Sequence, residues 1–159
     1  MDWVARARTL ALEAHAGQVD KAGHPYIGHV GRVAAAVRGD DEAAAVRGDD
    51  EAEAVAWLHD VIEDCPAFAG QVQAFPAPLQ DAVRLLSRTS AADADTYYAR
   101  ISADPLALKV KLADIADNAD EARMASLDAA TAERLRDKYR RALAALGQPA
   151  TPAAPPIEH

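Results

Sequence analysis

Apolar residues recur along this chain at intervals of three and four, which is the spacing of one face of an α-helix. The clearest stripes are Trp3-Ala7-Leu10-Ala14, Val30-Val33-Ala34-Val37 and Leu135-Tyr139-Leu143-Leu146. A half-buried β-strand would instead alternate apolar and polar residues with a period of two. The pattern therefore predicts an all-α fold in which each helix buries one face.

Residues that start or stop helices divide the chain into segments. Asp2 is suited to cap a first helix and Gly17 to end it, and a second helix is expected to begin within residues 26–29. A third is expected to end at Pro66. After an irregular stretch, helices are expected at roughly 79–88, 93–103, 105–123 and 128–146, with Asp104 as N-cap and Pro105 as first residue of the helix at 105–123.

Length and composition indicate one domain. The chain has 159 residues, of which 50% are hydrophobic and 5% aromatic, so residues 1–147 are expected to form a single core of closely packed helices. Residues 148–159 contain four prolines and little that can pack, and we expect them to be disordered. The single cysteine, Cys65, excludes an intramolecular disulfide.

Charge and hydropathy argue against several classes of partner. The formal net charge is −8, whereas binding to DNA or RNA rests on clustered lysine and arginine, so a nucleic-acid polymer is not expected. No stretch approaches the roughly 18 consecutive apolar residues of a membrane span. The N-terminal Met1-Asp2-Trp3 lacks the basic start of a secretory signal. We therefore expect a cytoplasmic protein that does not bind a membrane.

One nine-residue segment occurs twice in tandem, because residues 34–42 recur without change as residues 43–51. A solenoid requires at least three longer repeats, so the duplication indicates an insertion and not an architecture. If the second and third helices form an antiparallel hairpin, the duplication lies at its tip. There it can be mobile or mediate self-association into a homo-oligomer, while His29 and His59 meet at the opposite end.

His59, Asp60, Glu63 and Asp64 place four ionisable side chains in an otherwise apolar stretch of the expected third helix. At 100° per residue they share an arc of about 140°, with the two later acids one turn beyond the first pair. Imidazole and carboxylate ligands suit Mn, Fe, Co or Zn, and the later acids can orient or deprotonate a water. On these residues alone, the alternative is an exposed acidic helix end with an incidental histidine.

Two further residues are candidate ligands on weaker grounds. A single histidine on a helix, such as His29, is usually a buried and hydrogen-bonded side chain. Asp114 shares a helical face with Lys111 and Asn118, and the apolar face is centred about 120° away. That position also fits a plain solvated face, so residue spacing alone leaves both candidates open.

Three motifs, which follow one another along the chain, contain these residues and resemble those of a known family. They are residues 14–29 (AHAGQVDKAGHPYIGH), residues 58–64 (LHDVIED), and Lys111 to Asp114 (KLAD) followed by Asn118. Together they closely resemble the hydrolase domain of the RelA/SpoT group within the HD-domain phosphohydrolases. The helical pattern extends the similarity to about residue 146. We recognise no synthetase or regulatory domain and expect no regulation by an attached one.

The resemblance implies an HD-type helical bundle around one divalent metal ion, Mn²⁺. The residues that it assigns to the metal are His29, His59, Asp60 and Asp114. It assigns Glu63 and Asp64 to the hydrolytic water. The activity that it implies is removal of pyrophosphate from the 3′ position of guanosine tetra- and pentaphosphate.

The resemblance also implies the substrate contacts. Lys21 is expected to meet phosphate and Asn118 to contact the nucleoside or its phosphate, while Tyr26 either packs behind the metal ligands or touches the substrate. His15 matches the pattern too, and we expect it to make a structural hydrogen bond. Asp20 departs from the group, because alarmone hydrolases carry there an arginine that stacks on guanine. A carboxylate cannot supply that contact and would repel phosphate.

Three functions remain open at this point, and all have a small phosphorylated nucleotide as partner. The first is a metal-dependent guanosine 3′,5′-bis(diphosphate) 3′-pyrophosphohydrolase. The second is an HD phosphohydrolase acting on another nucleotide, such as a nucleoside monophosphate. The third is a non-catalytic nucleotide-binding module, which is less favoured because an unused cluster of buried charges costs folding free energy.

Deleting residues 43–51 would restore a single copy of the repeat. If the duplication lies at the hairpin tip, we expect hydrolysis to be essentially unchanged, because the deletion removes none of the expected site residues. Steady-state hydrolysis of guanosine tetraphosphate by the deleted and full-length chains measures this. A large loss of activity on deletion would show that the repeat supports the site and would contradict its placement at the far end of the hairpin.

Overall fold

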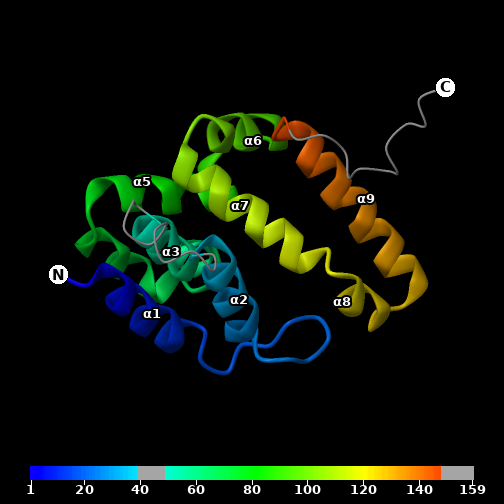
Figure 1. Ribbon diagram of the computed structural model, residues 1–159, viewed down its shortest axis with the longest axis horizontal. Coiled ribbons are helices and arrows are strands. Elements are labelled where there is room, and N and C mark those ends of the chain that lie inside the picture. Colours follow the sequence, from blue (N-terminus) through cyan, green and yellow to red (C-terminus); the bar gives the residue numbers. More distant parts are fainter. Residues whose placement is uncertain (39–48, 148–159) are drawn as a thin grey trace.

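The computed structural model describes residues 1–38 and 49–147, which are mostly helical (Figure 1). In chain order the helices are α1 (Trp3–Ala14), α2 (Tyr26–Arg38), α3 (Asp49–Leu58), α4 (Val61–Asp64), α5 (Ala77–Leu86), α6 (Ala94–Ser102), α7 (Pro105–Asn118), α8 (Glu121–Ala125) and α9 (Ala129–Ala145). Short 3₁₀ helices occupy Pro66–Ala74 and Arg88–Ser90. Within these residues there is no β-strand, only one isolated bridge between Val19 and Pro25. The prediction of an all-α fold is confirmed.

Aspartate side chains start several of these helices. The carboxylate accepts backbone N–H groups of the first turn at Asp2 for α1, Asp93 for α6, Asp104 for α7, Asp120 for α8 and Asp128 for α9. Such caps satisfy donors that have no partner within the helix. The predicted caps Asp2 and Asp104 are therefore confirmed. Gly17, with a φ of 80°, lies in the turn that follows α1.

Two of the expected helices are divided in the structure. The helix expected to run through His59 and Asp60 is interrupted there, between α3 and α4. The Ala56 carbonyl, which would accept from residue 60 in a continuous helix, instead accepts from His59 Nδ1 at 2.6 Å. The helix expected over 105–123 ends at Asn118, and Asp120 caps the separate helix α8. The prediction of one continuous helix through His59 to Asp64 was therefore wrong.

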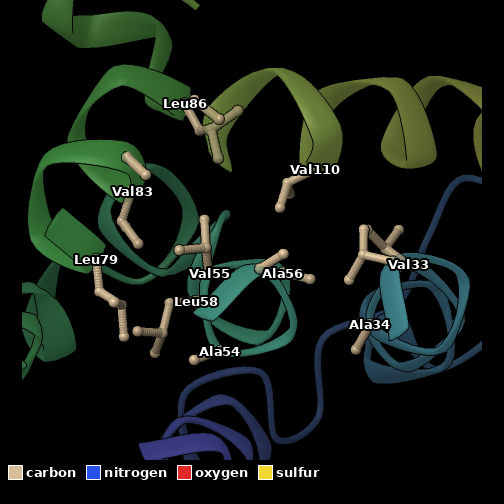
Figure 2. Close-up of a cluster of buried hydrophobic side chains, with 14 of the residues drawn as sticks. Val33, Ala34, Ala54, Val55, Ala56, Leu58, Leu79, Val83, Leu86 and Val110 are labelled. Carbon is tan, nitrogen blue, oxygen red and sulfur yellow. The ribbon is translucent and has the colours of Figure 1, made fainter. Parts of the chain in front are cut away.

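The hydrophobic core surrounds α3, which packs against α1, α2, α5 and α7. Figure 2 shows the α3 side chains between those of the neighbouring helices, and its labelled residues are Val33, Ala34, Ala54, Val55, Ala56, Leu58, Leu79, Val83, Leu86 and Val110. All of them are buried. Because α3 is enclosed on several sides, the turn that follows it is held firmly inside the molecule.

A second, smaller core joins α8 to α9. Met124, Ala132 and Leu135 are buried there, and Leu127 and Tyr139 pack against them. In Figure 1, α9 runs back along α7 towards α6, on the side away from α1. This arrangement places α9 beside α7, where it can form one wall of a cavity.

Several expectations fall on parts of the chain that the structure does not describe. The expected hairpin tip includes residues 39–48 and the expected disordered tail is 148–159, and both lie outside the described residues. The assignment of residues 1–147 to one HD phosphohydrolase domain likewise stays a prediction. Among the described helices, none is long and apolar enough to cross a membrane.

Candidate metal centre

Three parts of the chain bring four predicted ligands together. They are His29 from α2, His59 and Asp60 from the turn between α3 and α4, and Asp114 from α7. One ligand atom of each residue lies within 4.8 Å of those of the other three. The His29 and His59 ring centroids are 5.8 Å apart, which confirms that the start of the second helix meets the end of the third. Asp114, only 8% exposed, is not on a solvated face.

The Nδ1 atom of each imidazole, which points away from the centre of the cluster, lies next to an oxygen acceptor. His29 Nδ1 lies 2.7 Å from Asp117 Oδ2, and His59 Nδ1 lies 2.6 Å from the Ala56 carbonyl oxygen. Carbonyl and carboxylate oxygens only accept hydrogen bonds, so each Nδ1 carries a proton. The Nε2 atom of each ring is therefore the nitrogen available as a ligand.

The Nε2 atoms of both rings face carboxylate oxygens. His29 Nε2 lies 2.9 Å and His59 Nε2 lies 3.5 Å from the same Oδ1 of Asp114. His59 Nε2 also lies 3.0 Å from Asp60 Oδ2, yet within the part of the chain that the structure describes this buried atom has no hydrogen bond of acceptable geometry. Imidazole lone pairs facing carboxylate oxygens repel each other unless a positive charge lies between them. Two imidazoles and two carboxylates suit Mn, Fe, Co or Zn, so the donor set fits a divalent metal ion.

The pKa shifts show how strongly these groups interact. Burial alone lowers the pKa of His59, but the Asp60 and Asp114 carboxylates raise it well above its usual value. Burial alone raises the pKa of both aspartates. Nevertheless, His59 holds the pKa of Asp60 below its usual value, and His29, His59 and Lys111 hold the pKa of Asp114 well below its usual value. The cluster is thus a negative site in which a positive charge is stabilised.

Other side chains fix the orientation of the two carboxylates. The Tyr26 hydroxyl donates to Asp60 Oδ2, and burial together with the Asp60 charge raises its pKa, so it stays protonated. Asp114 accepts from Lys111 Nζ at 3.2 Å and from Asn118 Nδ2 at 3.2 Å. The structure therefore places Tyr26 behind a candidate ligand, and both Tyr26 and Asn118 also line the adjoining cavities.

Asp117 is a residue of the centre that the sequence reasoning missed. Besides its contact with His29, its carboxylate accepts from Arg32 Nε at 2.8 Å and from Arg123 Nη1 at 2.5 Å. Although burial raises its pKa, Arg32 and His29 hold the pKa below its usual value. The available signal was its position three residues after Asp114, which puts both carboxylates on one side of α7.

The two predicted catalytic acids stand on α4 at the edge of a cavity. Glu63 and Asp64 line a space of about 530 Å³ together with His59, Asp60 and Asp114. Glu63 Oε2 accepts the Arg88 backbone N–H at 3.1 Å, and Asp64 Oδ2 accepts from Gln18 Nε2 at 3.3 Å. Burial and the charge of Asp60 raise the pKa of Asp64. The structure thus brings both acids beside the four candidate ligands.

Four cations line this same cavity, namely Lys21, Arg88, Lys111 and Lys138. Burial and the positive charges of Lys111, Lys21 and Arg88 lower the pKa of Lys138. In a chain with a formal net charge of −8, this is a local concentration of positive charge. Lys21 was predicted to meet phosphate, whereas Arg88 and Lys138 carried no motif and were missed. Such a group of cations suits an anion with several charges, such as a nucleotide phosphate chain.

A second cavity of about 500 Å³ shares Lys21, Tyr26, Asn118 and Tyr139 with the first. Part of its wall is apolar, since Met124, Leu127 and Leu135 of the small C-terminal core line it. The two cavities therefore differ in chemistry, and together they suit a ligand with a charged part and a less polar part.

Asp20 has a structural role that the sequence reasoning did not predict. Its Oδ1 accepts the backbone N–H groups of Ala22 and His24, both at 2.9 Å, and its Oδ2 lies 3.4 Å from Arg123 Nη2. Burial raises the pKa of Asp20, but these N–H groups and Arg123 bring it below its usual value. The carboxylate thus fixes its own loop, and Arg123 compensates its charge.

Comparison with known proteins gives one informative similarity. No protein-family model matches the chain. Over 147 residues the chain is 32% identical to a Synechocystis protein named as a probable guanosine-3′,5′-bis(diphosphate) 3′-pyrophosphohydrolase. The similarity covers 84% of this chain and 18% of that curated relative. The chain therefore spans less than a fifth of the length of this relative.

Replacing Asp114 by asparagine tests the metal centre, because it removes a charged oxygen on which both imidazoles converge. A bound ion stabilises the folded protein by about 2.7 kcal/mol at one hundred times its dissociation constant. We expect Mn²⁺ to raise the melting temperature of the native chain and to have little effect on Asp114→Asn. Thermal unfolding with and without Mn²⁺, together with calorimetric titration, measures this.

Asp81→Asn provides the matched control, since Asp81 is an exposed aspartate on α5. It should keep the full stabilisation by Mn²⁺. If Asp114→Asn kept the same Mn²⁺ affinity and melting shift as this control, the four residues would not form the metal site.

Proposed function

We propose that this chain is a metal-dependent phosphohydrolase that acts on a phosphorylated nucleotide, with guanosine 3′,5′-bis(diphosphate) as substrate and Mn²⁺ as metal. The supporting observation is the four-residue donor set, which opens beside two acids into a cation-lined cavity. A divalent ion held by His29, His59, Asp60 and Asp114 supplies Lewis acidity towards a phosphoryl oxygen and acidifies water.

Glu63 and Asp64 are the groups that handle the attacking water in this proposal. Both are carboxylates at the cavity edge, and Glu63 is aligned by the Arg88 backbone N–H. The raised pKa of Asp64 suits a general base, because a weakly basic carboxylate accepts a proton poorly. Asp64 therefore receives the proton from the water, and Glu63 orients the water for attack.

The cations determine which substrate is favoured. Lys21, Arg88 and Lys138 compensate the negative charge of phosphate groups, and Lys111 is held against Asp114 at 3.2 Å. This number of cations matches a substrate with several phosphates better than a nucleoside monophosphate. The name of the Synechocystis relative supports the same substrate class.

The second cavity is where we place the nucleoside. Asn118 lines both cavities and can contact the nucleoside or the phosphate next to it. Arg123 brings a guanidinium group to the same wall on which alarmone hydrolases carry the arginine that Asp20 replaces here. A planar guanidinium can stack on a purine or donate hydrogen bonds to it. Guanine recognition therefore has a candidate residue in Arg123 of helix α8.

A nucleotide panel tests the substrate. With Mn²⁺ present, we expect guanosine 3′,5′-bis(diphosphate) to lose its 3′ pyrophosphate faster than nucleoside mono-, di- or triphosphates or cyclic nucleotides are hydrolysed. Product identification by anion-exchange chromatography separates pyrophosphate release from phosphate release. Faster hydrolysis of a nucleoside monophosphate would favour the second function. Tight nucleotide binding without turnover of any substrate would establish the non-catalytic module instead.

Asp64→Asn separates the acid from the metal centre. Loss of a general base typically lowers the rate by about 10²- to 10⁴-fold. We expect a fall in kcat of this size with Mn²⁺ affinity unchanged, because Asp64 is not among the four candidate ligands. Kinetics and calorimetry on the same samples, with Asp81→Asn as control, measure both properties. An unchanged kcat would remove Asp64 from the mechanism.

A further inference from the structure

Two side chains behind Asp64 form a hydrogen-bonded chain that ends on its carboxylate. Gln18 Nε2 lies 3.3 Å from Asp64 Oδ2, and His15 Nδ1 lies 2.8 Å from Gln18 Oε1. His15 is only 1% exposed, and it follows the last residue of α1, so its ring position is set by the core. These hydrogen bonds therefore connect the buried interior to Asp64 at the cavity edge.

The Asp64 carboxylate fixes the direction of both hydrogen bonds that link His15, Gln18 and Asp64. A carboxylate only accepts, so the Gln18 amide must turn its NH₂ group towards Asp64. Its carbonyl oxygen then faces His15, and a carbonyl oxygen only accepts as well. His15 Nδ1 must therefore carry a proton and donate a hydrogen bond to Gln18 Oε1. The opposite amide orientation would set two oxygens against each other at 3.3 Å.

The surroundings of His15 Nε2 indicate that Nδ1 is the ring nitrogen with a role in hydrogen bonding. His15 Nε2 is buried, and no hydrogen-bond partner for it lies within residues 1–38 and 49–147. An unpaired buried nitrogen destabilises the fold, so an apolar side chain would serve packing better. The neighbouring Cys65 thiol, 3.5 Å from Nδ1, donates instead to the Ala14 carbonyl at 3.1 Å. Burial raises the thiol pKa, so Cys65 stays neutral and adds no charge.

The loop between α1 and α2 is stiff enough to hold this chain in place. The Tyr26 backbone N–H donates to the Gln18 carbonyl at 2.8 Å, and Val19 forms a bridge with Pro25. Tyr26, the first residue of α2 after this loop, carries the hydroxyl that donates to Asp60. The loop and the start of α2 thus reach a candidate catalytic acid and a candidate metal ligand.

We infer that Gln18, held by His15, is a positioning residue for Asp64. Its amide engages Oδ2 and so sets the rotation of the carboxylate, which presents the other oxygen to the attacking water. This inference rests on the proposed function, because it gives Gln18 a role only if Asp64 handles that water. It predicts that Gln18 and His15 act on turnover and not on metal binding.

Gln18→Met keeps the length of the side chain and removes both hydrogen bonds. Loss of a partner that orients a functional group typically costs roughly 10- to 100-fold in activity. We expect a fall of that size in kcat, with KM and Mn²⁺ affinity measured by calorimetry little changed. In an Asp64→Asn background the same substitution should cause no further loss, because its effect passes through the Asp64 carboxylate.

Gln80→Met is the matched control. Gln80 is also partly buried, but its amide donates to the carbonyl oxygens of Gln73 and Phe75, away from the cavity. It should leave kcat unchanged, whatever its effect on the melting temperature. If Gln18→Met also left kcat unchanged, or lowered it equally in the Asp64→Asn background, the positioning role would be wrong.

Two substitutions at His15 distinguish its nitrogen atoms. In His15→Asn the amide nitrogen can occupy the position of Nδ1, whereas His15→Gln extends its amide towards the position of Nε2. We expect kcat to stay near that of the native chain in the first variant and to fall as in Gln18→Met in the second. Equal kcat in the two variants would contradict the inference.

Nitrogen-15 NMR of the native chain gives a readout that is independent of activity and of variant folding. The inference requires a proton on His15 Nδ1, and a ring protonated only on Nε2 would overturn it. If the native chain hydrolyses no nucleotide, the proposed function fails while the NMR spectrum still decides the hydrogen-bonded chain. If it does hydrolyse one and Gln18→Met is equally fast, the inference alone fails.

Discussion

The structure depends on one constraint, which is that two imidazole nitrogens converge on a single carboxylate oxygen. His29 Nε2 and His59 Nε2 lie 2.9 and 3.5 Å from Asp114 Oδ1. Neither ring can relieve this by exchanging its nitrogens, because each Nδ1 is already bonded to an oxygen acceptor, at Asp117 and at the Ala56 carbonyl. A positive charge must balance the cluster, and a divalent cation does this with the ligand types that it prefers. The buried helix α3 holds the His59–Asp60 turn in place against the repulsion between these groups.

The surroundings of the centre combine charges of both signs. Glu63 and Asp64 line the same cavity as His59, Asp60 and Asp114, and lysine and arginine side chains line it too, with Lys111 in direct contact with Asp114. A phosphorylated ligand that meets these cations would bring a phosphoryl group next to the acids. The adjoining cavity, with its partly apolar wall, has the size and chemistry for the uncharged part of such a ligand. The loop between α1 and α2 and the first residue of α2 contribute to these regions, through Gln18 and Lys21 of the loop and Tyr26 of α2.

The sequence predicted most of the fold and the four clustered residues, and its misses have physical causes. Apolar spacing and aspartate caps marked the helices because these signals are local. The break at His59 was missed because it depends on which acceptor its Nδ1 finds, a competition that spacing does not reveal. Asp117 of α7 was missed because its partner His29 lies on α2, and Lys138 of α9 was missed because the cavity that it lines is formed mostly by other parts of the chain. The structural role of Asp20 was missed for the same reason, since Arg123, which compensates its charge, lies 103 residues away in sequence.

Anomalous diffraction from crystals grown with Mn²⁺ tests the central claim most directly. The convergence of His29, His59, Asp60 and Asp114 predicts one strong anomalous peak, bonded to the Nε2 atom of both rings and to an oxygen of each carboxylate. A peak coordinated by other residues, or none at this position when Mn²⁺ is saturating, would contradict the metal centre and with it the proposed hydrolase.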